Sequence, residues 1–272
     1  MAKTTSPGIL SFNDPNTVAH AFKTRLQTGE IMLGGMIMEC IRPCISNIYK
    51  QAGYDFIYVE TEHTMFDGSA LADFLLGCRG NGIPTICKIP ILNRAYVARY
   101  LDNGACGIQL PRTESREQVT ELVDYMKFPP IGSRAAAPCF GNVDYCAPND
   151  PTAWLDSCNR STIVVAHVET RKGYKNAKEI ITTPGLDMLY IGPYDFSVSM
   201  GQPGNYDHPD LSKPMQDILT LCLEYKVPFG TTASGPDAGR RWIEQGCQFF
   251  EVVDELSLIS RGAFEAVRQY RM

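Results

Sequence analysis

Residues 162–201 read TIVVAHVETRKGYKNAKEIITTPGLDMLYIGPYDFSVSMG, and this stretch contains two short apolar runs separated by a helical segment. The apolar runs are residues 163–168 and 188–191, and their length and boundaries are typical of buried strands. Residues 173–181 between them predict a helix. Two strands joined in this way pair in parallel. The stretch therefore predicts an α/β fold built on a parallel sheet.

A carboxylate follows each of these two strands. Glu169 comes directly after the first, and Asp195 follows the second after the turn-forming pair Gly192-Pro193. Because parallel strands end at the same edge of a sheet, both acids are expected at the edge where α/β barrels bind ligands. Two hard carboxylate oxygens suit Mg²⁺ or Mn²⁺, so the pair predicts a metal site. The spacing alone equally allows Glu169 to cap the next helix and Asp195 to form a turn.

The same alternation of apolar strand and amphipathic helix continues along nearly the whole chain. The predicted strands are residues 31–38, 56–60, 85–89, 107–110, 163–168, 188–191, 229–232 and 249–253. Helices are predicted after them at 43–52, 69–79, 94–101, 116–126, 173–181, 213–225, 237–245 and 257–270. Eight such pairs predict a (β/α)₈ barrel. An open doubly wound sheet is the competing architecture, but no G-x-G-x-x-G follows a predicted strand.

Three segments lie outside this alternation. Residues 13–29 predict an extra N-terminal helix that plugs the bottom of the barrel. Residues 128–159 are irregular, with a short helix near Trp154, and a loop of this length is expected to be a lid or a subunit contact. Residues 1–14 are expected to form a loosely held tail. The whole chain, 1–272, is expected to be a single barrel domain.

The composition argues against several classes of protein. Hydrophobic residues make up 44% and charged residues 20%, and no apolar run approaches the roughly 20 residues of a membrane span. The net charge is −5 without a cluster of Lys and Arg, so no nucleic-acid partner is expected. The start of the chain lacks a secretory signal, so a cytoplasmic protein is expected. The ten cysteines include no C-x-x-C pair, and most are expected to be small core residues.

Barrel enzymes place their catalytic groups at the C-terminal ends of the strands, where this sequence has only a few polar residues. They are Glu60, Glu62, His63, Lys88, His167, Glu169, Tyr194, Asp195, Thr231 and Thr232. The carboxylate of Glu60 is expected to orient the His63 imidazole and raise its basicity as a general base, with a solvated loop histidine as the alternative. Lys88 lies in the apolar strand TICKIP, where an ammonium needs an anionic ligand or a carboxylate. A lysine that extends to solvent at the strand end is the alternative there.

Two further residues have positions that the topology constrains. His167 and Glu169 are two residues apart and therefore point to the same side of the strand. His167 is expected to touch substrate or metal, and a satisfied interior histidine is the alternative. Asp102 ends a predicted helix, which should place it at the opposite end of the barrel from the other candidates.

Longer motifs extend these observations. They are AGYDFIYVETEH (52–63), LDNGACGIQLPR (101–112), FPPIGSR (128–134), HVET (167–170), GLDMLYIGPYDFSVSMG (185–201) and DAGRRWIEQGCQFFEVVDELSLISRG (237–262). In order and spacing they resemble the HpcH/HpaI family of divalent-metal-dependent pyruvate aldolases. The resemblance covers about residues 30–265, and its G-P-x-D-x-S-x-x-x-G segment is specific.

The resemblance implies a role for each matching position. Glu169 and Asp195 would be the ligands of Mg²⁺, Mn²⁺ or Co²⁺, and His63 the catalytic histidine. The backbone around Tyr194 and Asp195 would contact the pyruvate carboxylate, and we expect His167 and Thr232 to contribute to substrate binding. Asp102 would raise the basicity of the histidine from a neighbouring protomer. A homo-oligomer that exchanges elements, a trimer or hexamer, is therefore implied.

Several positions depart from the family pattern. Glu60 stands where members usually carry Asp, which makes the acid near the histidine one methylene longer. Lys88 replaces the transition-state arginine and so lacks its planar bidentate fork. His167 stands at the position of a glutamine, and Met36 at that of an aromatic residue. We therefore expect the primary chemistry to be kept while the substrate or the partner electrophile differs.

These inferences combine into one hypothesis of function. A metal on Glu169 and Asp195 would chelate a 2-oxo acid and stabilise its enolate, while His63 moves the proton on the aldehyde side and Lys88 stabilises the oxyanion. The enzyme would cleave a 4-hydroxy-2-oxo acid to pyruvate, or a close 2-oxo acid, and an aldehyde. Three alternatives are a Schiff base on Lys88, the same enolate in another bond-forming or decarboxylating reaction, and a catalytically silent paralogue that binds a 2-oxo acid.

Overall fold

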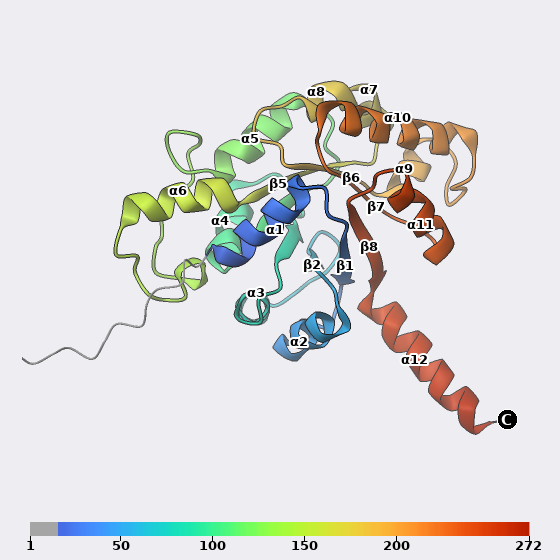
Figure 1. Cartoon of the computed structure of the whole chain (residues 1–272), viewed down its shortest axis with the longest axis horizontal. Helices are drawn as coiled ribbons and strands as arrows, with labels where there is room; N and C mark the ends of the chain where they lie inside the picture. Colours follow the sequence, from blue (N-terminus) through green and yellow to red (C-terminus); the bar gives the residue numbers. More distant parts are fainter. Residues whose placement is uncertain (1–15, 272) are drawn as a thin grey trace, which may run out of the picture.

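A computed structural model describes residues 16–271, which contain a closed barrel of eight parallel strands (Figure 1). The strands are β1 (Met32–Ile37), β2 (Phe56–Glu60), β3 (Thr85–Lys88), β4 (Gly107–Leu110), β5 (Ile163–Val168), β6 (Met188–Ile191), β7 (Phe229–Thr232) and β8 (Phe249–Asp254). Each pairs with its neighbours in sequence, and β1 with β8 closes the barrel. The predicted (β/α)₈ architecture is confirmed. The expected tail, residues 1–14, lies outside the described residues.

Helices follow the strands in the predicted order. They are α1 (Thr17–Gln27), α2 (Pro43–Ala52), α3 (Gly68–Gly80), α4 (Arg94–Asp102), α5 (Arg116–Met126), α6 (Pro151–Ser161), α7 (Arg171–Lys175), α8 (Ala177–Ile181), α9 (Pro193–Ser199), α10 (Pro209–Tyr225), α11 (Pro236–Glu244) and α12 (Glu255–Tyr270). Local signals explain their ends. Pro43 occupies the first turn of α2, and Gly53 ends that helix in the left-handed conformation, with a φ of 91°.

Several helices differ from prediction. The single helix predicted at 173–181 is two short helices, α7 and α8, because the chain breaks at Asn176 between them. Helix α9 was expected to be a turn, but Pro193 starts a helix here since a proline is well suited to the first helical position. Helix α10 begins at Pro209 rather than 213, with the His208 side chain as its N-cap and Pro214 inside.

The N-terminal helix closes the bottom of the barrel, as the sequence predicted. Phe22 of α1 lies 5.7 Å from the ring of Phe56 and 6.2 Å from that of Phe249, measured between ring centroids. Met32 completes this buried apolar layer, and Leu26 joins it from the next turn of α1. The interior at this end is therefore a packed core, and the barrel opens only at the other end.

The long irregular segment does not act as a lid. It contains a 3₁₀ turn, η1 (Gly141–Val143), and an α6 of eleven residues in place of the expected short helix. Phe128, Val143 and Trp154 form a small core of their own. The segment follows a helix, α5, and leads back to the start of β5, so it lies at the N-terminal end of the strands. A subunit contact remains a prediction for it.

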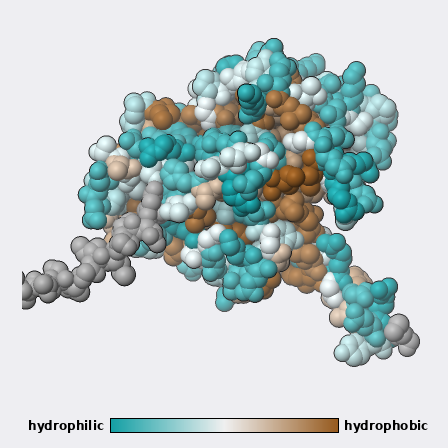
Figure 2. Space-filling model, viewed as in Figure 1, coloured by the Kyte–Doolittle hydropathy of each residue, from teal (hydrophilic) through white to brown (hydrophobic). Residues whose placement is uncertain are grey.

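Helix α12 extends away from the barrel instead of packing on it (Figure 1). Its apolar side chains are therefore exposed, including Phe264 at 77% and Val267 at 49%. The outer side of β8 is also uncovered at Val252, and Figure 2 shows hydrophobic surface gathered beside this strand. In residues 16–271 no helix has the length and hydrophobicity to span a membrane.

We predict that Phe22→Ala destabilises the protein by about 3–5 kcal/mol, because the missing ring leaves a cavity under the barrel. Thr24→Ala on the exposed side of α1 is the matched control and should change stability by less than about 0.5 kcal/mol. Urea denaturation followed by circular dichroism measures both. Equal effects of the two substitutions would show that α1 does not contribute to the core.

Candidate active site

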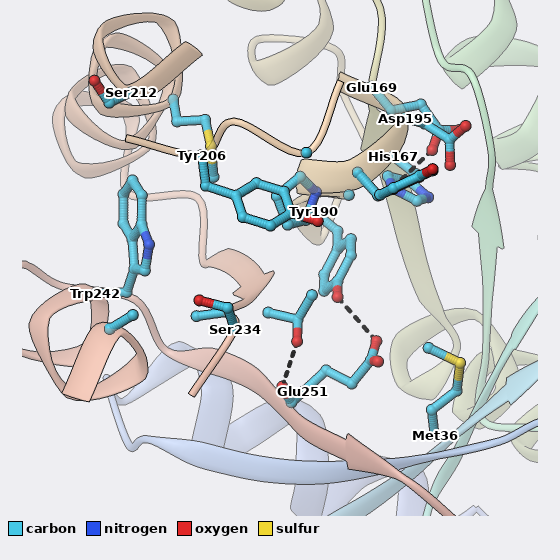
Figure 3. A pocket seen from close by; sticks show the side chains of 18 of the residues that line it. Met36, His167, Glu169, Tyr190, Asp195, Tyr206, Ser212, Ser234, Trp242 and Glu251 are labelled. Carbon is cyan, nitrogen blue, oxygen red and sulfur yellow. Dashed lines mark hydrogen bonds and ion pairs between the residues drawn. The ribbon is translucent and has the colours of Figure 1, made fainter. Parts of the chain in front are cut away.

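A cavity of about 940 Å³ lies at the C-terminal end of the strands (Figure 3). Side chains of the barrel interior form its floor, and α9, α10 and α11 contribute to its walls. It is lined by most of the predicted site residues, namely Glu60, His63, Lys88, His167, Glu169, Tyr194, Asp195 and Thr232. The sequence thus located the cavity correctly, because all of these residues follow or end parallel strands.

Glu169 and Asp195 lie beside each other on one wall of the cavity (Figure 3). Oε1 of the buried Glu169 accepts a hydrogen bond of 2.6 Å from the backbone N–H of Arg112. Arg112 has a φ of 48°, an unusual conformation for a residue with a side chain, which indicates local strain at the site. Sequence reasoning missed Arg112, since only its backbone acts here.

The electrostatics of this wall fit a divalent cation. Burial raises the pKa of Glu169 to about 7 against the opposing effects of Lys88 and the Arg112 N–H, and the charge of Asp195 raises it further. No cluster of three or more His, Cys, Asp or Glu suited to a metal occurs in residues 16–271. Two carboxylates nevertheless match Mg²⁺, which commonly takes one or two carboxylates and completes its shell with water and substrate. The donor set therefore fits the implied metal.

Lys88 is the buried cation of the site. Its Nζ lies 2.7 Å from Oε2 of Glu62 and 3.2 Å from Oε2 of Glu60. Burial alone would lower the pKa of the ammonium, but Glu60, Glu62 and Glu169 together outweigh it and raise the pKa above its ordinary value. Because a protonated amine lacks a free electron pair, this environment argues against Lys88 as a Schiff-base nucleophile.

His63 lies at the mouth of the cavity with its side chain 63% exposed. The expected contact between Glu60 and the imidazole is wrong. Oε1 of Glu60 accepts hydrogen bonds from the backbone N–H groups of Glu62, at 2.6 Å, and His63, at 3.2 Å. The Glu60 carboxylate therefore binds the backbone of the loop after β2 instead of the imidazole. The acid that lies near the His63 ring is Glu62, whose Oε2 is 3.6 Å from Nε2 of His63.

His167 is held in the barrel interior. The side-chain amide of Gln109 is 2.9 Å from its Nδ1, and the ring of Tyr190 packs edge-on against it. Its Nε2 lies 3.2 Å from Oε2 of Glu169, and a side chain at Gly192 would overlap the imidazole. Burial, with a smaller effect of Lys88, holds the pKa of His167 well below its usual value. The neutral imidazole of His167 thus lies next to the carboxylate of Glu169, one of the two candidate metal ligands.

Below this level the barrel contains a polar layer that the sequence analysis missed. It consists of Tyr58 (β2), Gln109 (β4), Tyr190 (β6) and Glu251 (β8), one interior residue from each alternate strand. Nε2 of Gln109 donates to the Tyr58 hydroxyl at 2.9 Å, and the Tyr190 hydroxyl donates to Oε2 of Glu251 at 2.9 Å. Such layers are usually filled by branched apolar residues. The signal available in the sequence was the glutamate within the apolar strand FFEVV.

Four predicted candidates remain, of which Tyr194 and Thr232 line the cavity and Thr231 and Asp102 do not. Tyr194 is largely exposed on the cavity wall, and Oγ1 of Thr232 donates to the backbone oxygen of Glu251 at 2.9 Å. Thr231 is buried and donates to Ile191. Asp102 lies outside the cavity at the end of α4, where the buried Arg134 contacts it at 2.7 Å. Its position confirms the topological expectation, and its implied catalytic role stays a prediction that requires a second protomer.

Comparison with known proteins adds the family context. The model of the HpcH/HpaI aldolase/citrate lyase family matches residues 35–260. A 5-keto-4-deoxy-D-glucarate aldolase of Salmonella paratyphi A is 27% identical over 254 residues, which cover 91% of this chain and 93% of that protein. Among solved structures, an HpcH/HpaI aldolase from Desulfitobacterium hafniense has a TM-score of 0.86 at 25% identity and covers 92% of this chain and 96% of its own. An HpcH/HpaI aldolase/citrate lyase family protein from Burkholderia cenocepacia has a TM-score of 0.85 at 25% identity, with coverages of 93% and 100%.

We predict that Glu251→Gln stabilises the protein more at pH 8.5 than at pH 5. Burial first, and the charge of Glu60 next, raise the pKa of Glu251 to about 7 despite the Tyr190 hydrogen bond, so the folded state favours the protonated carboxyl. Wild-type stability from this group is full below pH 4.5 and is lost as the pH rises through about 7, whereas glutamine does not titrate.

At 1.36 kcal/mol per pKa unit, the gain in unfolding free energy should be about 2 kcal/mol larger at pH 8.5. Urea denaturation of both proteins at both pH values measures it, with Glu244→Gln on the exposed surface of α11 as the control. A gain that is the same at pH 5 and pH 8.5 would contradict the assignment of a protonated, buried Glu251.

Proposed function

The chain belongs to the HpcH/HpaI aldolase/citrate lyase family, and from this premise we propose that it reversibly cleaves a 4-hydroxy-2-oxo acid to pyruvate, or a close 2-oxo acid, and an aldehyde. The observation that carries the proposal is the adjacent pair of Glu169 and Asp195 in the same cavity as the buried cation Lys88. This combination supplies negative ligands for a metal and a positive group for the substrate within one pocket.

Glu169 and Asp195 are the residues that would hold Mg²⁺, Mn²⁺ or Co²⁺. A divalent ion bound there supplies Lewis-acid stabilisation to the carboxylate and keto oxygen of a 2-oxo acid. The protein holds Glu169 in place through the hydrogen bond from the Arg112 N–H to one oxygen, and the neutral His167 lies beside the other. Backbone groups around Tyr194 and Asp195 contact the substrate carboxylate in this proposal.

Lys88 and His63 serve the remaining charges of the reaction. The ammonium of Lys88, fixed between Glu60 and Glu62, stabilises the oxyanion that develops as the carbon–carbon bond breaks. His63 accepts the proton of the 4-hydroxyl group in the cleavage direction and returns it to the alkoxide in the synthetic direction. Its exposed position at the mouth suits the aldehyde half, which enters and leaves there.

The far wall of the cavity favours an aldehyde with an anionic group. Arg241 and Trp242 of α11 line this wall, together with Ser212 and Gln216 of α10. Within residues 16–271 the Arg241 guanidinium has no ion-pair or hydrogen-bond partner, so it is available to a carboxylate. The Salmonella relative is named for a sugar diacid substrate, which carries a second carboxylate. We include a carboxylated acceptor in the proposal on this basis.

A second candidate function keeps the same enolate and adds it to another carbonyl acceptor or forms it by decarboxylation. The lysine at position 88, in place of an arginine, favours this alternative because a point charge orients a carboxylate less strictly than a planar fork. A silent paralogue is less well supported, since the acids, the histidine and the cation all line one cavity.

We also propose that the protein is a homo-oligomer in which α12 packs on a neighbouring protomer. In one chain, α12 leaves its apolar side chains exposed together with Val252 on the outer side of β8. The outer face of a barrel strand is normally covered by a helix. The uncovered β8 of one protomer and the exposed apolar side of α12 from another would cover each other. The proposal follows from the apolar area that both would remove from water.

We predict that Glu169→Gln lowers metal-dependent exchange of the pyruvate methyl protons with D₂O by about 100-fold or more, because one of two charged ligands is lost. Proton NMR of the chelator-treated protein, before and after addition of Mn²⁺ or Mg²⁺, measures the exchange. Glu179→Gln, on the side of α8 and outside the cavity, is the control. An unchanged rate with an unchanged metal titration would overturn the metal site.

We further predict that Phe264→Glu reduces the molar mass of the assembly in solution without lowering the stability of the monomer, because this ring is exposed in a single chain. Light scattering after size-exclusion chromatography measures the mass over a range of concentrations. Gln269→Ala on the same helix is the control. If wild type is monomeric at micromolar concentration, the exchange of α12 is excluded.

A further inference from the structure

The floor of the cavity contains a carboxyl group that the proposed function does not use. Glu251 is 4% exposed, faces the barrel interior from β8 and lines the cavity (Figure 3). Oε2 accepts the Tyr190 hydroxyl at 2.9 Å, and no partner for Oε1 occurs in the described part of the chain. One oxygen is therefore fixed by a hydrogen bond, and the other is available to a molecule in the cavity.

Burial of this group is costly unless it has a role. Glu251 belongs to the polar layer of Tyr58, Gln109 and Tyr190, at a level where barrels usually place branched apolar side chains. A carboxyl with a single neutral hydrogen-bond donor is poorly compensated for the loss of water. Carboxyl groups with strongly raised pKa values in a cleft occur preferentially at functional sites.

The charged groups around Glu251 leave it without a counter-ion of its own. Glu60 faces it from β2, Lys88 from β3, and Asp254 lies on its own strand. The ammonium of Lys88 contacts Glu60 and Glu62 at ion-pair distance. Burial is the main cause that raises the pKa of Glu251 to about 7, and Glu60 and Asp254 act in the same direction. The group is thus poised to gain and lose a proton near neutral pH.

We propose that Glu251, positioned by Tyr190, is the catalytic acid and base at the methyl carbon of the 2-oxo acid. This inference rests on the proposed function. After carbon–carbon cleavage, the Glu251 carboxyl gives its proton to C3 of the enolate, whose C=C electron pair forms the new C–H bond while the C2–O⁻ becomes a carbonyl. In the reverse direction the Glu251 carboxylate removes a methyl proton and the enolate forms again.

Three other titratable groups of the cavity are unsuited to this step. His63 stands at the exposed mouth, on the aldehyde side. Lys88 is held as a cation by two carboxylates, and His167 is a buried neutral imidazole directed at Glu169. Glu251 is a carboxyl that lies on the floor, away from Glu169 and Asp195 (Figure 3), whereas the carboxylate of Glu60 is held by Lys88 and the backbone of the loop after β2. In this assignment, His63 transfers the proton on the aldehyde half of the substrate and Glu251 the proton on the 2-oxo acid half.

The test measures exchange of the pyruvate methyl protons in D₂O from pH 5.5 to 9, with the metal-loaded wild-type protein and with Glu251→Gln. Exchange uses the carboxylate as base, so the wild-type rate should rise as the pH passes about 7. Glu251→Gln keeps the size of the side chain and its hydrogen bond to Tyr190 but cannot transfer the proton. Its rate should fall by about 100-fold and lose this rise, with pyruvate affinity unchanged. Glu251→Asp should recover part of the rate.

A matched pair of tyrosines tests the positioning role. The Tyr190 hydrogen bond lowers the pKa of Glu251, so Tyr190→Phe should move the rise in rate to higher pH. Tyr58→Phe removes a hydroxyl of the same layer that binds Gln109 and not Glu251, and it should leave the position of the rise unchanged. Thermal unfolding confirms that each variant is folded before the rates are compared.

The outcomes separate the two proposals. An active wild type together with a Glu251→Gln variant that has the same rate and the same pH dependence overturns the role of Glu251 and leaves the aldolase proposal standing. A shift caused equally by Tyr58→Phe and Tyr190→Phe overturns the positioning role of Tyr190. A wild-type protein that exchanges no protons with any added metal overturns both proposals.

Discussion

The cavity depends on an imbalance between five acids, three of them buried, and one buried cation. The acids are the buried Glu60, Glu169 and Glu251, the partly exposed Glu62 and the exposed Asp195. Within residues 16–271, Lys88 is the only lysine that lines the cavity, and it contacts Glu60 and Glu62. Like charges in a medium of low dielectric repel strongly, and desolvation adds to the cost of each. The excess must be offset by bound protons or by a cation. Glu169 and Glu251, the two acids with pKa values of about 7, are the positions where this compensation occurs.

The barrel makes this imbalance tolerable by arranging its interior in layers. The aromatic layer of Phe22, Phe56 and Phe249 closes one end and supplies the apolar burial that holds the strands together. The polar layer lies above it, and the layer of Met36, Lys88, His167 and Thr232 from the odd-numbered strands forms the next level. Apolar packing at one end of the barrel thus offsets the energetic cost of the buried polar groups at the other end.

The barrel could be predicted closely because strands buried on both faces are continuous apolar runs, and β2, β4, β5, β6 and β7 have the predicted bounds. Helix α9 could not, since Gly-Pro indicates a turn and a helix start equally well. The contact of Glu60 was wrong because spacing along the chain does not show which atom of His63 the carboxylate meets. Glu251 and Gln109 could not be predicted as site residues, because they lie inside strands instead of at strand ends. Their contacts to Tyr190 and Tyr58 depend on the register of strands that are far apart in the sequence.

The lysine at position 88 links these features. An arginine at this level would present its guanidinium as a fork that one carboxylate can occupy with two hydrogen bonds. The compact ammonium instead lies between Glu60 and Glu62, two residues apart along the chain, and fixes the loop that carries His63. Lys88 therefore couples the mouth of the cavity to its floor, because the same Glu60 also raises the pKa of Glu251. A change at this one position is therefore expected to alter the position of the histidine and the proton affinity of the buried acid together.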